Sequence, residues 1–289
     1  MNTEIAKYKF KEGLALEFEM FNISDLYKKY KKVHTVPHRP DFYQIIWIQE
    51  GKATYEVDFN LINLSRNSLL FIPKNGVNLF DKNDIYEGRI IAFTDNFFCK
   101  EQEDMNFLNT TILFHDLYEI SHINSEPSNE IFSELFELMY KEYNSSNDKF
   151  HYDILRNYLH LFLLQSEREK RKQGFKEIKP GADLSYLMLF KEVLEKRFKK
   201  YRSINRYASE LSIPVNRLNK ASFQTIGKSP KQLIDERILL EAKRLLAHST
   251  LSIKEIAFEL GFDEPTNFIK YFRKHNHITP AEFRQKMLK

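Results

Sequence analysis

Two short segments near the C-terminal end of the chain combine amide, hydroxyl and basic side chains at helical spacing. In the first segment, Asn216, Asn219 and Lys220 fall on one helix face, opposite the apolar Leu218. An asparagine amide pairs well with the edge of adenine, and a lysine ammonium can reach guanine or a phosphate group. This segment is therefore predicted to be a helix with one face suited to contact nucleic acid.

The second segment repeats this chemistry 50 residues further along the chain. Thr266, Ile269 and Lys270 form the corresponding face, and the Ile269 side chain is suited to meet the methyl group of thymine. Arg273 and Lys274 follow, and we expect them to bind phosphate, as most contacts of this kind do. For each of these residues, simple exposure to solvent is the alternative interpretation.

The elements that must position these segments also occur twice. Three apolar residues recur 49 residues later, with Ile204, Ala208 and Leu211 matching Ile253, Ala257 and Leu260. The pair Ser229-Pro230 recurs 50 residues later as Thr279-Pro280. The apolar spacing is typical of one face of a helix, so each copy is predicted to contain a short helix ahead of its polar segment.

A glycine-containing turn is predicted between the two helices of the second copy. Gly261 stands where a left-handed residue would end the first helix, and Asp263 is expected to cap the next one. Phe268 and Phe272 lie one turn apart and are expected to face inward. This arrangement is the helix-turn-helix pattern of DNA-binding proteins, with recognition helices predicted at 215–226 and 264–275.

The segment between the two copies, 231–247, contains no proline or glycine and carries regularly spaced apolar residues. It is predicted to be one continuous helix that holds the two units at a fixed distance. Successive major grooves on one face of a duplex lie ~34 Å apart. Two units on a rigid helix would therefore suit a single chain that contacts two successive turns of DNA.

Over about the last hundred residues, the sequence resembles the DNA-binding domain of the AraC/XylS family of bacterial transcription regulators. The residues that carry the resemblance are Ile234, Arg237, Ala242, Leu245, Leu246, Ser252, Ile253, Ile256, Ala257, Gly261, Phe262, Asn267, Phe268, Phe272, Arg273, Lys274, Thr279, Pro280, Phe283 and Arg284. The resemblance implies a sequence-specific transcription regulator that assembles as a homodimer. We expect an activator, and the alternative is a repressor of the regulated genes. It implies promoter or operator DNA and RNA polymerase as partners.

The sequence departs from the family pattern at three places. Pro214 stands where a serine usually caps the first recognition helix, and proline offers no capping oxygen. Ser222 takes the position that matches Phe272, and Phe223 follows where a basic residue is common. His277 replaces a usual glycine after the second recognition helix, which suggests a modified loop within the same fold.

Basic residues are concentrated in the same part of the chain. Residues 184–289 hold 21 Lys and Arg against 11 Asp and Glu, a net charge of +10, whereas the remainder has a net charge of −6. Clustered positive charge attracts the phosphate backbone and releases counterions. A lysine-rich surface alone could be merely solvated, but its coincidence with the duplicated motif favours DNA binding.

Residues 10 to about 120 carry short aromatic and β-branched runs typical of strands. Residues 42–49 and 53–59 are predicted to pair as a hairpin around a turn at Glu50-Gly51-Lys52. Several short strands favour a small barrel, and this half resembles the cupin-like effector domain of the same family. The predicted fold class is α+β with two domains: a cupin-like β-barrel with dimerisation helices, then an all-α domain with two helix-turn-helix units.

A small barrel is suited to enclose a ligand, here an unidentified small-molecule effector. His38, Trp47 and Tyr55 are the candidates to line its pocket, and ordinary core packing is the alternative for Trp47 and Tyr55. Enzymatic cupins bind a metal through clustered histidines and a carboxylate, but Asn78 stands where a histidine would be needed. We therefore predict no metal, cofactor or catalytic residue; the alternative is a cupin-type metalloenzyme with a basic C-terminal domain.

Residues 129–172 change to helical periodicity. The family resemblance implies dimerisation contacts on the second apolar stripe of this region, formed by Leu155, Tyr158, Leu159 and Phe162. Residues 173–183 are polar, contain glycine and proline, and are predicted to be a linker. The predicted domains are thus 1–172 for effector binding and dimerisation and 184–289 for DNA binding.

The composition indicates where the protein works. No apolar run approaches the ~20 residues that span a bilayer, and the N-terminal residues contain no apolar signal segment. The single cysteine, Cys99, allows no internal disulfide. These features predict a cytoplasmic protein that does not bind membranes.

Overall fold

The computed structural model describes residues 5–8, 10, 17–26, 28, 36–80, 86–114, 120–124, 130–145, 148–174 and 181–287 of the chain. The chain divides into two compact units, Ala6–Lys176 and Glu177–Lys289, and the second also includes Met1–Ile5. We call them the N-terminal unit and the C-terminal unit. Most of the predicted linker, 175–180, lies outside the described residues.

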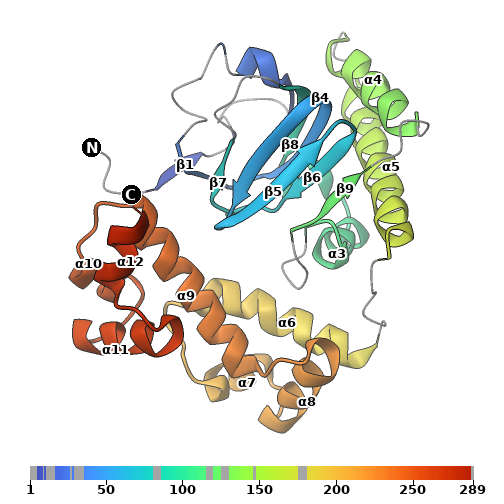
Figure 1. The fold of residues 1–289 in the computed structure, drawn as a ribbon. Helices are drawn as coiled ribbons and strands as arrows, with labels where there is room; N and C mark the ends of the chain where they lie inside the picture. The colour runs from blue at the N-terminus through green and yellow to red at the C-terminus, as the bar shows by residue number, and fades with distance from the viewer. Residues whose placement is uncertain are drawn as a thin grey trace. The chain divides into compact units, whose positions relative to one another are not determined.

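The N-terminal unit is built on one sheet of nine strands (Figure 1). The strands are β1 (Ala6–Tyr8), β2 (Phe18–Asn22), β3 (His38–Pro40), β4 (Tyr43–Val57), β5 (Asn60–Ser65), β6 (Ser68–Ile72), β7 (Asn78–Leu79), β8 (Tyr86–Phe93) and β9 (His122–Asn124). Neighbouring strands pair in the order β1-β3-β7-β4-β6-β9. In addition, β5 and β8 each pair with β4, and β2 pairs with β8. Among the described strands this path has two free ends, so the sheet is cupin-like but not closed, and the predicted barrel is corrected to an open sheet.

β4 is the central strand. It runs through both segments predicted to pair as a hairpin, 42–49 and 53–59. The chain does not reverse at Gly51; β4 continues through a β-bulge between Ile48 and Glu50, and Gly51 takes a φ of +82°. The reversal comes at Asp58 and Phe59, whose φ values of +48° and +68° suit a tight two-residue turn. The hairpin partner is therefore β5, and the predicted pairing around 50–52 is wrong.

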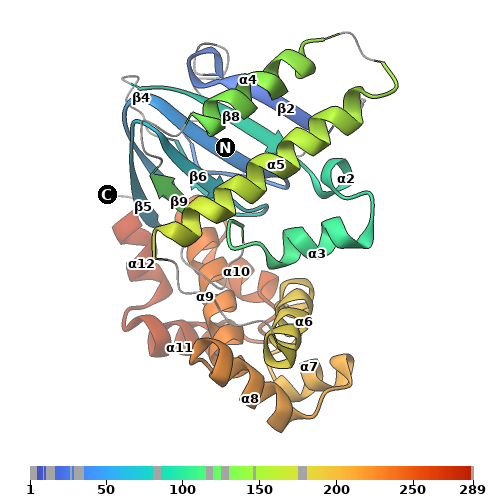
Figure 2. The same ribbon diagram turned by 90° about the vertical axis from the view of Figure 1, so that its right-hand side faces the viewer.

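The two faces of this sheet bury different cores. On one face, aromatic and aliphatic side chains pack under α4 (Ile131–Tyr143) and α5 (His151–Lys172), which lie across the sheet in Figure 2. On the other face, Ile46, Tyr55 and Phe80 belong to a second buried cluster. Two shorter helices, α2 (Asp95–Phe98) and α3 (Gln102–Thr110), follow the last long strand.

The C-terminal unit is entirely helical across the fully described range 181–287. Its helices are α6 (Ala182–Arg197), α7 (Ile204–Leu211), α8 (Val215–Ile226), α9 (Pro230–His248), α10 (Ile253–Glu259), α11 (Pro265–Asn276) and α12 (Pro280–Met287). In Figure 1, α10, α11 and α12 gather at one end of α9, and α7 and α8 lie at the other. The predicted spacer is thus one helix of 19 residues, about 28 Å long.

No helix in the described ranges is both long enough and apolar enough to cross a lipid bilayer.

Candidate DNA-binding interface

The first helix-turn-helix unit consists of α7 and α8. Ser203 caps α7, because its hydroxyl accepts a hydrogen bond from the backbone N–H of Asn205. The turn depends on Ser212, which takes a left-handed φ of +55°. Pro214 holds the N-cap position of α8 and supplies no capping hydrogen bond, as the sequence predicted.

The second unit consists of α10 and α11. Ser252 and Glu255 form a capping box at the start of α10, and the hydrogen bonds from Ser252 lower the pKa of the Glu255 carboxyl. Gly261 takes a φ of +75°, which confirms the predicted left-handed turn. The expected cap at Asp263 is wrong: Glu264 is the N-cap residue, and Pro265 opens α11 instead, since its fixed φ suits the first helical position.

The two units use equivalent left-handed residues at matching positions. Ser212 corresponds to Gly261 at a shift of 49 residues, and Gly227 corresponds to His277 at a shift of 50. His277 takes a φ of +60° where Gly227 takes +70°. The substitution of histidine for glycine therefore leaves the backbone of this turn unchanged.

Hydrogen bonds join α11 and α12 to α9. The Tyr271 hydroxyl on α11 donates to the Asp235 carboxylate on α9 at 2.7 Å. Burial, together with this bond, raises the pKa of Tyr271, so its hydroxyl stays protonated and remains a donor. The Arg284 guanidinium on α12 donates to the backbone carbonyl of Leu246 on α9 at 3.1 Å.

A half-buried arginine, Arg202, packs against the turn of the second unit. The Arg202 guanidinium stacks on the Phe262 ring at 3.4 Å from its centroid and donates to the Leu260 carbonyl at 2.9 Å. Desolvation lowers the pKa of Arg202. The turn between α10 and α11 is thus held by side-chain contacts as well as by Gly261.

The predicted contact residues lie on the outer faces of α8 and α11. The exposed ones are Asn216, Asn219, Lys220, Thr266, Lys270, Arg273 and Lys274. Ile269 is half-buried, and the inward positions of the two helices are filled by Leu218, Phe268 and Phe272. This placement makes the predicted residues available to a ligand, and their contacts with DNA remain a prediction.

Two exposed residues on α8 were absent from the predicted contact set. Phe223 and Gln224 follow Lys220 by three and four positions, so they continue the same face. The helical spacing of the sequence could have identified both. Phe223 lacks the charged or amide group that predicts contact with DNA, whereas Gln224 has one.

The three candidate effector residues are buried but do not come together. The rings of His38 and Tyr55 both contact Phe80, at centroid distances of 5.4 and 5.1 Å. Trp47 lies in the other core cluster and packs against Phe136 of α4 at 5.5 Å. His38 and Tyr55 therefore share one face of the sheet, and Trp47 occupies the opposite face.

A buried amide accompanies His38 and Tyr55. Asn78 pairs with His38 across adjacent strands and donates through Nδ2 to Gln44 Oε1 at 3.0 Å. Its Oδ1 atom is buried without a hydrogen-bond partner among the described residues. The described residues contain no group of three or more histidine, cysteine, aspartate or glutamate side chains placed to hold a metal ion.

The predicted dimerisation residues lie in the protein's own core. Leu155, Leu159 and Phe162 are fully buried beneath α4 and the sheet, and Tyr158 packs against the same cluster. Leu155, Leu159 and Phe162 fill the apolar contact between α5 and the sheet, so they do not offer a surface to a second subunit, whereas Tyr158 is half-buried. This prediction is corrected accordingly: a dimer contact on α5 would need other residues.

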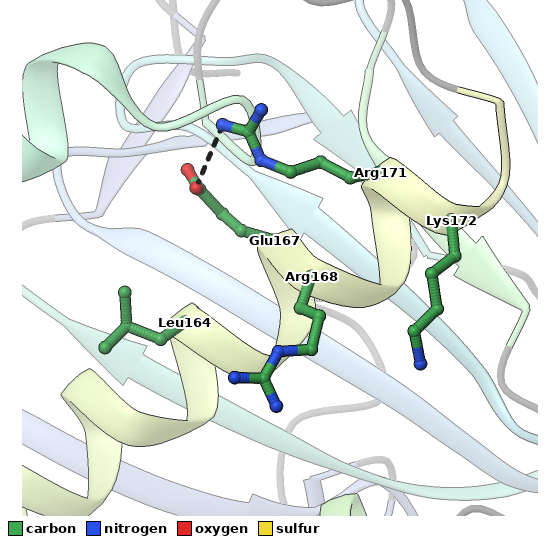
Figure 3. Close-up of a pocket in the computed structure, with 5 residues that line it drawn as sticks. All are labelled: Leu164, Glu167, Arg168, Arg171 and Lys172. Carbon is green, nitrogen blue, oxygen red and sulfur yellow. Dashed lines mark hydrogen bonds and ion pairs between the residues drawn. The ribbon is translucent and has the colours of Figure 1, made fainter.

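The outward side of α5 carries a different stripe. Asn157, Leu161, Leu164 and Arg168 are exposed at successive helical turns. Figure 3 shows a surface depression on this helix, lined by Leu164, Glu167, Arg168, Arg171 and Lys172. Arg168 and Lys172 extend to one side of the helix, whereas Glu167 and Arg171 extend to the other and form an ion pair at 3.5 Å.

The fold and the interface define a class of protein: a DNA-binding transcription regulator with two helix-turn-helix units and a sheet-rich ligand-binding domain. Two family models match the chain, "Helix-turn-helix domain" over residues 207–286 and "AraC-like ligand binding domain" over residues 25–163. The chain belongs to the AraC/XylS family of transcription regulators.

Two similar proteins match most of the chain, and a third matches part of it. The HTH-type transcriptional activator RhaS of Klebsiella pneumoniae is 24% identical over 264 residues, covering 86% of this chain and 87% of RhaS. A crystal structure of ToxT from Vibrio cholerae matches with 16% identity and a TM-score of 0.44, covering 98% of this chain and 95% of ToxT. A DNA-binding transcriptional dual regulator from Escherichia coli matches 39% of this chain and 98% of its own, with 24% identity and a TM-score of 0.33.

Proposed function

We propose that α8 and α11 bind two successive major grooves of one DNA duplex and that this protein thereby regulates transcription at specific promoters. The observation that carries the proposal is the pair of helix-turn-helix units within one compact unit, each with an exposed polar and basic face. The helix α9 between them is about 28 Å long, close to the ~34 Å between successive major grooves. The net charge of +10 on residues 184–289 adds affinity for phosphate that is independent of sequence.

The relatives support an activating role. RhaS is described as a transcriptional activator, and we propose the same role for this protein, with RNA polymerase as a further partner. The protein would act in the cytoplasm, where bacterial DNA lies. In this proposal residues 184–289 bind DNA and residues 1–172 bind the effector.

Selection of genomic fragments tests the proposal directly. Purified protein is incubated with sheared DNA from the source genome, and bound fragments are sequenced after several rounds. We expect enrichment of a few sites, each with two conserved segments about one helical turn apart. Uniform recovery of all fragments would contradict sequence-specific regulation and would favour a purely architectural DNA-binding protein.

Lys270 is expected to contribute to base recognition. Replacing Lys270 by alanine should weaken binding to a selected duplex by about 1–3 kcal/mol while binding to unrelated duplexes changes little. The matched control is Arg273→Ala on the same helix, which should weaken binding to all duplexes and reduce the salt dependence by about one ion. Fluorescence anisotropy at several salt concentrations separates the two effects. A uniform loss for Lys270→Ala would make Lys270 a phosphate contact.

Ligand control is proposed to act through the sheet face that carries His38 and Tyr55. The supporting observation is the buried Asn78 Oδ1 atom, an acceptor that could receive a hydrogen bond from a bound molecule. An effector acts only by binding two arrangements of the protein with different affinity. DNA affinity measured with and without candidate small molecules tests the idea; unchanged affinity throughout would contradict ligand control and leave DNA binding intact.

We propose that the protein dimerises through the exposed stripe of α5. Leu161 and Leu164 are 41% and 47% exposed, an unfavourable arrangement for two leucines one turn apart unless another surface covers them. Changing both to glutamate should raise the Kd of the dimer about a hundredfold or more, since four apolar side chains would lose their contacts. Analytical ultracentrifugation measures this change.

Leu138 provides the control for the dimer prediction. It is also 41% exposed but lies on α4, so Leu138→Glu should leave the dimer unchanged. A dimer that survives the double substitution on α5 would move the contact to another surface.

A further inference from the structure

Phe223 is an exposed aromatic side chain on the proposed DNA-contacting face. Its side chain is 64% exposed, the largest exposed fraction among the phenylalanines of the described residues. It follows Asn219 by four positions and Lys220 by three, so the three side chains line one face of α8. Single exposed apolar residues are common on protein surfaces, so the argument depends on its position in this line.

The inward side of α8 shows that Phe223 is not a displaced core residue. Leu218, Ala221 and Ser222 fill the buried positions, and the Ser222 hydroxyl donates to the Lys228 carbonyl at 2.6 Å. Ser222 thus has a satisfied buried role at the position where the second unit uses Phe272. The core of the first unit is complete without Phe223.

The equivalent position of the second unit carries opposite chemistry. A shift of 50 residues places Phe223 in register with Arg273, which is exposed on α11. Arginine can bind a phosphate group, whereas a phenyl ring has no donor for one. The two units therefore differ in the kind of contact that this position can make.

We propose that Phe223 is a specificity-determining residue that packs against the C5-methyl group of a thymine in the major groove. This inference rests on the proposed DNA-binding function. Asn216 and Phe223 are separated by about 10 Å along the helix axis, which is close to three base-pair steps. Thymine alone presents an apolar group on the major-groove edge, and phenylalanine is one of the side chains that contact it. At this position the first unit would thus contact a base through an apolar group, whereas the second would bind phosphate through Arg273.

Uracil substitution isolates this contact. A duplex selected from the genome is prepared in versions that each carry deoxyuridine in place of one thymine, which removes a single methyl group and keeps every hydrogen bond. At one thymine of the segment bound by α8, the full-length protein should bind the substituted duplex about fourfold more weakly. Phe223→Ala should bind the two duplexes equally, because the partner of the methyl group is then missing.

Two further variants provide controls. Phe258→Ala removes another exposed phenylalanine, 48% exposed on α10, and should keep the fourfold discrimination. Phe223→Leu retains an apolar side chain and should keep part of the discrimination between the thymine and uracil duplexes. Thermal unfolding should be the same for all variants, since both phenylalanines are exposed.

The outcomes separate this inference from the proposed function. If specific duplexes are selected but uracil at every thymine position leaves their binding unchanged, the role of Phe223 is overturned and the proposed function stands. Equal uracil sensitivity in the protein and in Phe223→Ala would also overturn it, because another residue would then contact the methyl group. Failure to select any sequence would overturn both the function and the inference.

Discussion

Replacing Gly261 by alanine is expected to destabilise the C-terminal unit by about 3–5 kcal/mol, from a left-handed backbone and an overlap with its surroundings. Gly261 has a φ of +75° in the turn between α10 and α11. A β-carbon added there would lie 1.9 Å from the backbone carbonyl oxygen of Lys199, much closer than any real contact. Either Lys199 or the turn must move to relieve this overlap.

Gly227→Ala is the matched control for Gly261→Ala. Gly227 has a φ of +70°, but a β-carbon there would meet nothing within 4 Å, so only the backbone term of about 1–2 kcal/mol applies. Ser212 and His277 show that these turns accept side chains in the left-handed region where space allows. Urea unfolding followed by far-UV circular dichroism measures both variants. Equal destabilisation would mean that the carbonyl of Lys199 moves at little cost.

The same turn shows what the sequence could predict and where it failed. A glycine after an apolar helical stripe predicted the left-handed residue at 261, because glycine adopts that backbone with little strain. The equivalent residue in the first unit, Ser212, carries no such signal, since serine rarely takes a positive φ. The duplication of the motif is the feature of the sequence that could have identified it.

Strand geometry explains why one candidate effector residue, Trp47, lies on the opposite face of the sheet from His38 and Tyr55. Trp47 and Tyr55 are eight residues apart, so regular alternation along a strand would put both on one face. The β-bulge between Ile48 and Glu50 adds one residue to β4 and reverses the parity beyond it. The bulge falls at Gln49 and Glu50, next to Gly51, and a polar run with a glycine is as typical of a hairpin turn as of a bulge, so the face of Trp47 could not be predicted.

The predicted dimerisation contact is wrong for Leu155, Leu159 and Phe162, because an apolar stripe on a helix does not specify the surface against which it packs. The periodicity of α5 correctly indicated that Leu155, Leu159 and Phe162 would be buried, and the structure buries them against the sheet of the same chain. The remaining stripe, with Leu161 and Leu164, is narrower and interrupted by polar residues. Only the packing of α5 on the sheet distinguishes the two sides of the helix.

Replacing Glu241 by glutamine is expected to destabilise the C-terminal unit by about 3 kcal/mol, the lower end of the range for breaking a buried ion pair. Glu241 is 2% exposed on α9, and its carboxylate accepts hydrogen bonds from Arg237 and Arg244, each at 3.2 Å. Arg237 also pairs with Glu195 of α6 at 2.6 Å and stacks on Phe198. Glutamine keeps the shape of the side chain but removes the negative charge beside the buried guanidinium of Arg244 and the partly buried one of Arg237.

Glu236→Gln is the control for Glu241→Gln on the same helix. Glu236 pairs with Lys228 at 2.8 Å, but both side chains are about half exposed, so the loss should stay below about 1 kcal/mol. The single tryptophan, Trp47, lies in the N-terminal unit, so its fluorescence should report an unfolding transition that neither variant shifts. A large shift in far-UV circular dichroism for Glu241→Gln alone would show that the buried charge cluster stabilises the helix between the two DNA-binding units. If both variants unfolded alike, the cluster would contribute no more than an exposed pair, and the rigidity of α9 would depend on its apolar contacts alone.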